Sequence, residues 1–348
     1  YFSKFELTHF YRTSVYDDLA RDDLPANLHH YTSPFDLYRQ LVAARPVVIQ
    51  SVEPFSYYTQ PLLWACYFAA RKLNANLLTV ALENRLLGIK FGKLRAALLR
   101  RVLRMYLKRA CLIIVENNGA QQNVLDCGVS SNCIRRALWG TWGVDTDEFT
   151  PRAARPPDVL PTILFAGRLH PEKGVFVLME AFARVRQRIP TARLLMAGAG
   201  AARDALGRRA QELGVSGAIH WLGSVKHREM PQVFQEADVF CAPSITTRKW
   251  AEQVGVASLQ AMACGVPVVS THSGAIPEYI PDGIAGLLVE EQNANALADA
   301  LIQLLTNREL AHQMGTRGRE YACAHYDARR NVQLCEQLVM EHCLARGI

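Results

Sequence analysis

Two cations lie close together in the turn that follows a buried apolar run. The run 163–166 has the composition of a strand, and the apolar residues of 175–185 recur at helical spacing. Arg168 and Lys173 stand in the segment between them. Such a turn lies at the carboxyl end of a parallel strand, where helix N–H groups and positive side chains suit a diphosphate. The alternative is a solvated loop whose charges bind nothing.

Other apolar runs in the second half also end in glycine or serine. Gly198 follows the run 192–197, and Ser224 and Val225 follow the run 218–221. Because the carboxyl ends of parallel strands meet at one edge of a sheet, we expect these turns to lie together. Several such turns at one edge are typical of a nucleotide-binding crevice.

Strand-like and helical segments also alternate in the first half. We expect strands at 46–51, 76–81 and 111–115, with a helix over 60–72 between the first two. This order predicts an α/β chain with parallel sheets, and 348 residues allow two cores.

A proline-rich stretch at 151–161 reads as a linker between the halves. We therefore expect domains at 1–150 and 151–330. A C-terminal helix over 331–348 is expected to cross back to the first domain.

The net charge of +7 is concentrated in one segment of the first half. Residues 84–115 contain nine basic residues and no acidic one. On a helical wheel the basic side carries Lys93, Arg100, Arg101, Arg104 and Lys108, and the apolar side carries Leu94, Leu98, Leu99, Val102, Met105 and Tyr106. Such a face over 93–108 fits an anionic membrane or acceptor phosphates, and the alternative is a core helix with a solvated outer face. Aromatic residues are not interleaved with the charges, which argues against nucleic acid.

The nine cysteines form no C-x-x-C pair, so neither a zinc site nor a disulfide framework is expected. This usage fits a reducing compartment. The sequence from Tyr1 shows no signal-peptide pattern, and no apolar run approaches the roughly 20 residues of a membrane span. We expect a cytoplasmic protein, at the inner face of the membrane if the basic segment binds lipid.

Six motifs of the second half occur together in a specific order. They are GRLHPEKG at 167–174, AGAG at 197–200, LGSV at 222–225, ADVFCAPS at 237–244, EQVGVASLQAMACGVPVV at 252–269 and SGAIPE at 273–278. In these motifs the chain resembles the retaining, nucleotide-sugar-dependent glycosyltransferases of GT-B fold, family four (glycosyl transferases group 1). The resemblance is strong over about 143–305 and weaker over 1–142. It implies two Rossmann-like domains facing across a cleft, with the acceptor side on the first and the nucleotide sugar on the second.

The resemblance also implies a reaction. A sugar would move from a nucleoside diphosphate sugar to a hydroxyl of a glycan, glycolipid or small metabolite, with retained configuration. Arg168 and Lys173 would stabilise the leaving diphosphate in place of a metal ion, and no cofactor is implied. Glu252 would hold hydroxyls of the transferred sugar.

The same resemblance assigns binding positions. The N–H groups of Gly255 and Val256, at a helix start, would face the donor phosphate. Backbone near Ser224 and Val225 would meet the base. Gly167 and Gly198 would let the turns approach the donor closely.

Two departures from the family pattern stand out. The family has a second glutamate, which holds the ribose, separated from the first by seven intervening residues, but this chain has the neutral Gln260 at that position. The first domain lacks a glycine-rich loop near its N-terminus, and Glu83 stands where a histidine is expected. Glu83 is either an acceptor-side base or a buried structural carboxylate. The alternative function is a catalytically weakened scaffold that binds nucleotide sugars.

Overall fold

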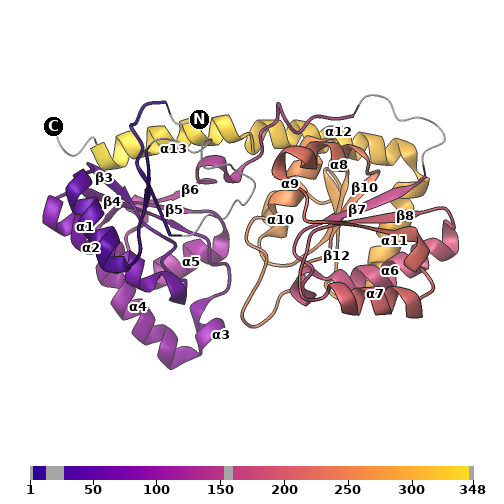
Figure 1. Ribbon diagram of the computed structural model, residues 1–348, viewed down its shortest axis with the longest axis horizontal. Coiled ribbons are helices and arrows are strands. Elements are labelled where there is room, and N and C mark those ends of the chain that lie inside the picture. Colours follow the sequence, from indigo (N-terminus) through magenta and orange to yellow (C-terminus); the bar gives the residue numbers. More distant parts are fainter. Residues whose placement is uncertain (1–2, 13–26, 153–159, 345–348) are drawn as a thin grey trace. The chain divides into compact units, whose positions relative to one another are not determined.

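The computed structural model describes residues 3–12, 27–152 and 160–344. Residues 153–159 of the expected linker lie outside these ranges. The chain forms two compact units (Figure 1). The second unit is Trp142–Ala328, and the first combines the residues up to Thr141 with those from Arg329 onward. The C-terminal segment thus belongs to the same unit as the first 141 residues.

The first unit is built on a four-stranded parallel sheet. Its strands, in spatial and chain order, are β3 (Val48–Gln50), β4 (Asn76–Ala81), β5 (Ala110–Val115) and β6 (Ile134–Arg136). A separate two-stranded parallel sheet pairs β1 (His9–Tyr11) with β2 (Leu28–His30).

Helices cover both faces of this sheet because its strands are apolar on both sides. Leu77 and Ile113 pack under one layer, whereas Leu78 and Leu112 pack under the other. The first layer contains α1 (Pro34–Ala44), α2 (Gln60–Leu73), α3 (Leu87–Phe91), α4 (Lys93–Leu107) and α5 (Asn118–Asp126). The second contains α13 (Ala328–Val339) and a short π-helix at Met340–Leu344.

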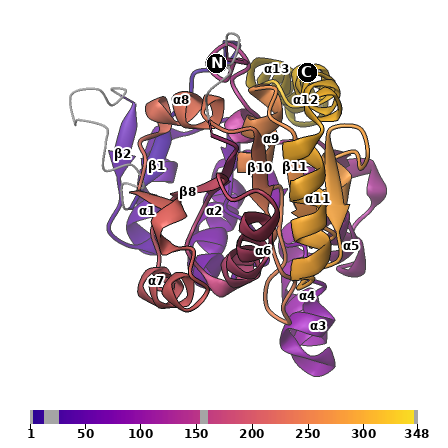
Figure 2. The same ribbon diagram turned by 90° about the vertical axis from the view of Figure 1, so that its right-hand side faces the viewer.

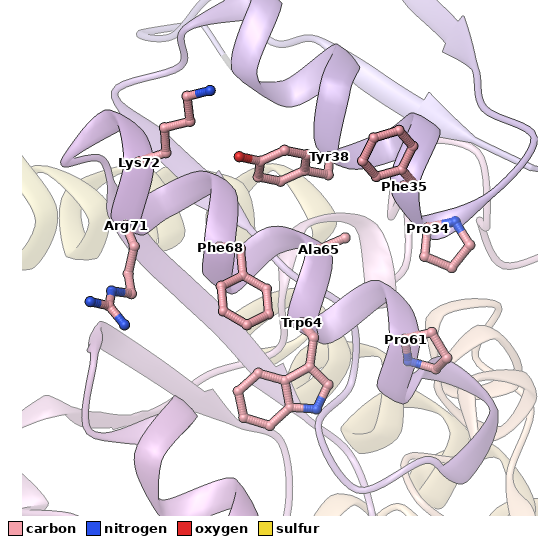
Figure 3. Close-up of a pocket in the computed structure, with 9 residues that line it drawn as sticks. All are labelled: Pro34, Phe35, Tyr38, Pro61, Trp64, Ala65, Phe68, Arg71 and Lys72. Atoms are coloured by element: carbon pink, nitrogen blue, oxygen red, sulfur yellow. The ribbon is translucent and has the colours of Figure 1, made fainter.

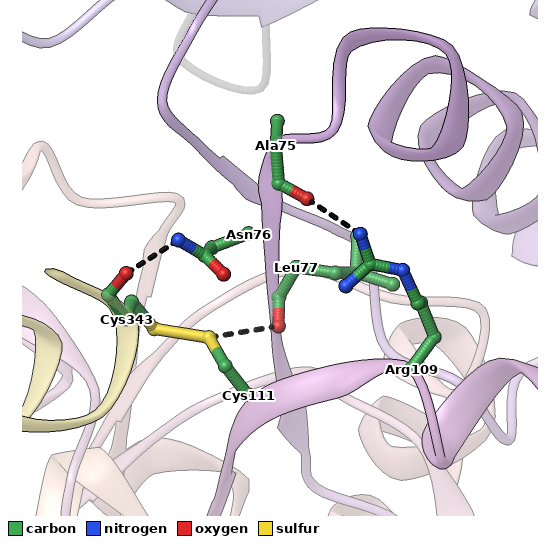
Figure 4. Close-up of a disulfide and its surroundings, with 6 residues drawn as sticks. All are labelled: Ala75, Asn76, Leu77, Arg109, Cys111 and Cys343. Carbon is green, nitrogen blue, oxygen red and sulfur yellow. Dashed lines mark hydrogen bonds between the residues drawn. A yellow bond between two sulfur atoms is a disulfide. The ribbon is translucent and has the colours of Figure 1, made fainter. Parts of the chain in front are cut away.

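A disulfide between Cys111 and Cys343 joins the π-helix to β5, with 5.6 Å between the Cα atoms (Figure 4). The amide of Asn76 donates to the carbonyl of Cys343 beside it. Cysteine spacing gave no sign of this bond, because the two residues are 232 positions apart and meet only through the return of the C-terminal segment. The expectation that no disulfide framework exists therefore needs correction at this one pair.

The second unit has a six-stranded parallel sheet with the order β12-β11-β10-β7-β8-β9. The strands are β7 (Thr162–Ala166), β8 (Arg193–Ala197), β9 (Ile219–Gly223), β10 (Val239–Ala242), β11 (Val268–Thr271) and β12 (Gly286–Val289). This is the Rossmann order, and the chain reverses direction across the sheet between β7 and β10. Ligands bind such sheets at the carboxyl ends of the two strands beside that switch point.

Helices cover both faces of this sheet as well. One face carries α6 (Val175–Arg188), α7 (Arg203–Glu212) and α11 (Ala294–Thr306), and α6 and α11 lie side by side in both views (Figures 1 and 2). The other carries α8 (Met230–Gln235), α9 (Val256–Ala263), α10 (Ile276–Tyr279) and α12 (Arg308–His325). The predicted α/β class with Rossmann-like units is confirmed. Among the described residues, no helix has both the length and the apolar character that crossing a bilayer requires.

Candidate functional site

The turn after β7 holds Lys173 against Glu252, which belongs to the loop after β10. Lys173 Nζ lies 2.7 Å from Glu252 Oε2. Ser244 Oγ donates to the same oxygen over 2.7 Å, and the Lys173 ammonium lies 4.8 Å from the centre of the Trp250 ring. Both charged side chains are largely buried, so their attraction is less screened than at an open surface. The switch point thus carries a cation and a carboxylate in direct contact.

Arg168 occupies the same turn but lies further out. Its Nη2 donates to Glu172 Oε1 over 3.0 Å, and its side chain is 64% exposed. His170 Nδ1 lies 3.6 Å from the same oxygen. The structure therefore brings Lys173 and Glu252 together and directs Arg168 toward Glu172. No group of three or more metal-ligating side chains occurs in the described ranges of the chain.

The start of α9 presents a set of backbone donors on the same loop as Glu252. Gly255 caps the helix in a left-handed conformation with φ of +73°. The first N–H groups of a helix have no partner within it, so Gly255 and Val256 stand where an anion is bound well. Gln260 follows Val256 by one turn and therefore shares its face of the helix.

The glycine turns after β7, β8 and β9 are joined by backbone hydrogen bonds. Gly167 N donates to Ala197 O over 2.9 Å, and Gly198 N donates to Gly223 O over 2.7 Å. A Cβ at Gly198 would overlap the carbonyl of Gly167. The packing of one turn on the next is therefore enough to require glycine at 198. Because Gly198 is bonded to Gly223 at the end of β9, the exposed Ser224 that follows also lies beside these turns.

A family-wide sequence profile, described as glycosyl transferases group 1, matches residues 147–321. The chain belongs to this family. Among related group 1 proteins, the GDP-mannose-dependent alpha-(1-6)-phosphatidylinositol monomannoside mannosyltransferase of Mycobacterium tuberculosis is 34% identical over 194 residues, 53% of this chain and 50% of the relative. The D-inositol 3-phosphate glycosyltransferase of Corynebacterium jeikeium is 32% identical over 233 residues, 62% of this chain and 53% of the relative. The chain thus spans about half the length of these curated relatives.

Solved structures similar to this group 1 chain share its fold. Sucrose-phosphate synthase from Thermosynechococcus elongatus superposes with a TM-score of 0.73 at 22% identity, over 88% of this chain and 76% of that one. Anabaena HepE in complex with UDP and glucose gives 0.73 at 17% identity, over 92% and 87%. The fold is therefore GT-B, and the expected membership of the GT-B group 1 glycosyltransferases is confirmed.

The group 1 motifs alone did not identify the residues that form hydrogen bonds to the loop after β10. Glu291 accepts from the N–H of Thr246 over 2.6 Å and from its hydroxyl over 2.7 Å. The Thr246 hydroxyl also lies 3.0 Å from Ser273 Oγ. These contacts fix the loop that carries Trp250 and leads to Glu252. Glu291 closely follows β12, so the rule that polar groups gather at strand ends could have found it.

In the first unit, Glu83 lies just after β4 and is buried. Its carboxylate accepts from the N–H of Arg85 over 2.9 Å and pairs with Lys90 Nζ. Asn123 donates to the carbonyls of Glu83 and Arg85 and so holds the same turn closed. These contacts supply a structural reason for the carboxylate, and a role on the acceptor side remains a proposal.

Two more glutamates follow the strands on either side of β4, and no motif in the sequence gave them a role. Burial raises the pKa of Glu53 to about 7, and the nearby Glu83 carboxylate adds to the increase. Hydrogen bonds from the N–H groups of Leu82 and Phe55 oppose it. Burial likewise raises the pKa of Glu116 to about 7, against a 2.9 Å bond from the N–H of Trp139. The carboxyl end of this sheet therefore takes up protons near neutral pH.

Replacing Glu53 by glutamine is expected to flatten the dependence of stability on pH. In the wild-type chain the raised pKa means that Glu53 contributes to the free energy of unfolding at acidic pH. This contribution is lost as pH rises toward about 7. The loss between pH 5 and pH 8 is about 2 to 3 kcal/mol for such a shift. Urea unfolding of wild type and Glu53→Gln at both pH values measures it. The exposed Glu6→Gln is the control, and equal pH dependence in all three chains would contradict the prediction.

Proposed function

We propose that the chain is a retaining glycosyltransferase that moves a sugar from a nucleoside diphosphate sugar to a hydroxyl acceptor, without a metal ion. The observation that carries the proposal is the partly buried Lys173–Glu252 pair at the switch point of a Rossmann sheet. Membership of the group 1 family supports it. The acceptor class is a glycan, a glycolipid or a small metabolite.

Each charged group has a distinct role in this reaction. The Lys173 ammonium has three N–H donors, so it can keep Glu252 and still donate to the leaving diphosphate. Arg168 adds a second positive charge at the outer side of the turn, and both offset the charge that develops on the nucleotide. Glu252 accepts hydrogen bonds from sugar hydroxyls, while Gly255 and Val256 donate backbone N–H groups to the phosphate.

The bond-breaking step needs no further group. The glycosidic C–O bond to the diphosphate breaks with its electron pair on the phosphate oxygen. That oxygen accepts the acceptor's proton while the acceptor oxygen bonds to the same face of the sugar, which retains the configuration. Backbone near Ser224 and Val225 meets the base, and Gly167 and Gly198 set the spacing of the turns around it.

The base and sugar are best found by thermal shift with UDP-, GDP-, ADP- and dTDP-sugars. The named relative from M. tuberculosis depends on GDP-mannose, and the HepE structure contains UDP. A donor present at 100 times its Kd stabilises the folded chain by about 2.7 kcal/mol. Hydrolysis of that donor, with the first-formed anomer read by NMR, then tests both transfer and retention. Inversion would contradict the retaining assignment.

A second candidate is a catalytically weakened scaffold of the same fold, which the neutral Gln260 favours. Tight binding of a donor with no hydrolysis and no transfer to any acceptor would support it. Slow hydrolysis of a bound donor without added acceptor supports the enzyme instead.

Replacing Gln260 by glutamate is expected to tighten nucleotide binding about fivefold. A carboxylate makes charge-assisted bonds to ribose hydroxyls, which are worth about 1 kcal/mol more than neutral ones. Calorimetric titration of the free nucleoside diphosphate measures the change. The matched control is Gln253→Glu, which adds the same charge on the loop just before α9 and does not share the Val256 face of that helix. Equal affinities of Gln260→Glu and wild type would show that residue 260 does not reach the ribose.

We also propose that α4 contacts an anionic membrane surface. The helix buries only a narrow stripe of side chains, Ala96, Leu103, Tyr106 and Leu107. Four residues of the apolar side seen on the helical wheel, Leu94, Leu98, Val102 and Met105, are exposed instead. Exposed cations, among them Arg101 and Lys108, flank these four exposed apolar residues. Arg100, in contrast, pairs with Asp126 over 2.6 Å. An apolar stripe beside cations suits an interfacial helix that lies in the plane of the lipid head groups.

Reversing the charge of Arg101 and Lys108 to glutamate is expected to weaken binding to anionic vesicles at least thirtyfold, since each cation near the surface contributes about 1 kcal/mol. Vesicle sedimentation measures the affinity. The control is Arg208→Glu with Arg317→Glu, which makes the same charge change on exposed residues of the second unit. Equal loss in both variants would show a general charge effect and remove the role of α4.

A further inference from the structure

A groove on the outer side of α1 and α2 has a lining that suits an amphiphile. Its volume is about 620 Å³, within the range usual for ligand sites. Phe35, Tyr38, Trp64 and Phe68 line it, together with two prolines and an alanine. Phe35 is 69% and Phe68 is 53% exposed. Exposed aromatic side chains that share one groove are typical of an interaction site.

The polar groups of this α1/α2 groove gather at one end. Figure 3 shows Arg71 and Lys72 at the end away from the two prolines, and the Tyr38 hydroxyl points toward that end. None of the nine lining residues is acidic. Within the described ranges, neither Arg71 nor Lys72 forms an ion pair. The lining therefore complements a ligand with a long apolar body and one anionic end.

The groove adjoins α4, the helix proposed to contact the membrane, through the buried side of that helix. Trp64 of α2 packs edge-on against Tyr106 of α4, with 6.3 Å between the ring centres. Both helices belong to the layer on one face of the same sheet. Anionic amphiphiles at such a surface are bilayer lipids rather than free fatty acids.

We infer that the α1/α2 groove holds one acyl chain of an anionic bilayer phospholipid, with its phosphate at Arg71 and Lys72. The inference rests on the membrane contact proposed for α4. It does not depend on the catalytic assignment, because no residue of the groove takes part in the proposed reaction.

The test uses the fluorescence of Trp64. Vesicles of phosphatidylglycerol with brominated acyl chains quench a tryptophan only when the chain lies in contact with it. We expect these vesicles to quench a component of the emission that the Trp64→Phe variant lacks. The other four tryptophans supply the common background. Equal quenching of wild type and Trp64→Phe at saturating vesicles would overturn the inference.

The cations provide a second measurement. Replacing both Arg71 and Lys72 by glutamine is expected to raise the lipid concentration for half-quenching about 25-fold, or about fivefold for each cation. The control, Arg208→Gln with Arg317→Gln, removes the same charge from exposed positions of the second unit. Equal shifts in the two variants would overturn the assignment of the phosphate.

Two outcomes separate this inference from its alternatives and from the role of α4. Quenching of Trp64 by a free brominated fatty acid, with none by the vesicles, would overturn the bilayer source. Vesicle sedimentation reports the contact of α4, whereas quenching of Trp64 in the bound protein reports the groove. Bound protein with unquenched Trp64 would therefore remove the groove inference and leave α4 in place.

Discussion

Replacing Lys173 by alanine is expected to lower turnover of the donor sugar about 100- to 1000-fold while the chain stays folded. In the proposed reaction the ammonium donates to the leaving diphosphate from a partly buried position, and loss of one such donor costs about that factor. Arg168→Ala is expected to lose about tenfold, because its guanidinium is 64% exposed and therefore more strongly screened. Steady-state hydrolysis of the donor identified by thermal shift measures both rates.

The control for Lys173 lies on the helix that begins just after it. Arg188→Ala removes one exposed cation at the far end of α6, about 20 Å away, and should leave turnover unchanged. A rate in Lys173→Ala equal to that of Arg188→Ala would remove Lys173 from the chemistry.

A double-mutant cycle separates two ways in which Lys173 can act. If its only role is to hold Glu252, then Glu252→Gln alone should reproduce the loss, and adding Lys173→Ala should cost nothing more. If the ammonium offsets charge on the nucleotide, the double variant should be slower than Glu252→Gln. The second result is the one expected here, because Ser244 also holds the Glu252 carboxylate and would keep it in place.

Local patterns predicted the sheet elements well because buried parallel strands are apolar on both faces. The run 163–166 became part of β7, and the run 76–81 is β4 itself. The same reasoning could not predict which side of α4 faces the core, because an amphipathic pattern alone does not show how the helix packs. Only the packing of Leu103 and Leu107 on the core shows that the stripe beginning at Leu94 faces solvent. The Cys111–Cys343 bond was equally hidden, because it depends on tertiary structure.

From the sequence, the candidate site could be predicted only where its residues lie just after a predicted strand or in a motif. Lys173 and Glu252 were each found from a motif, but their contact depends on the order of β7 and β10 in the sheet. That order is a property of the whole unit and cannot be read from either motif. Burial is also tertiary, so the raised pKa of Glu53 could not be seen in its sequence neighbours. A rule that examines every polar residue just after a strand would have included Glu53, Glu116 and Glu291.

Replacing Gly174 by alanine is expected to destabilise the chain by about 2 to 5 kcal/mol and to impair the site as well. Gly174 has φ of +69°, where alanine costs about 1 to 2 kcal/mol. A Cβ there would also overlap the carbonyl of Pro243, in the loop after β10, which adds about 1 to 3 kcal/mol of strain. Relief of that overlap requires the two turns to move apart.

The chain contains a matched control for this substitution. Gly214 has the same φ of +69°, but a Cβ there would meet nothing within 4 Å. Gly214→Ala should therefore show only the backbone cost, about 1 to 2 kcal/mol, with turnover unchanged. Urea unfolding of both variants isolates the steric cost of bringing the turns after β7 and β10 together.

Turnover in the Gly174→Ala variant tests what that close approach is for. Separation of the turns would draw Lys173 away from Glu252 and Ser244, and a misplacement of about 1 Å can cost about 100-fold in rate. Activity should therefore fall in Gly174→Ala even at low temperature, where the variant is folded. Equal destabilisation by the two substitutions, with full activity in both, would show that the two turns are held in position by something other than this backbone contact.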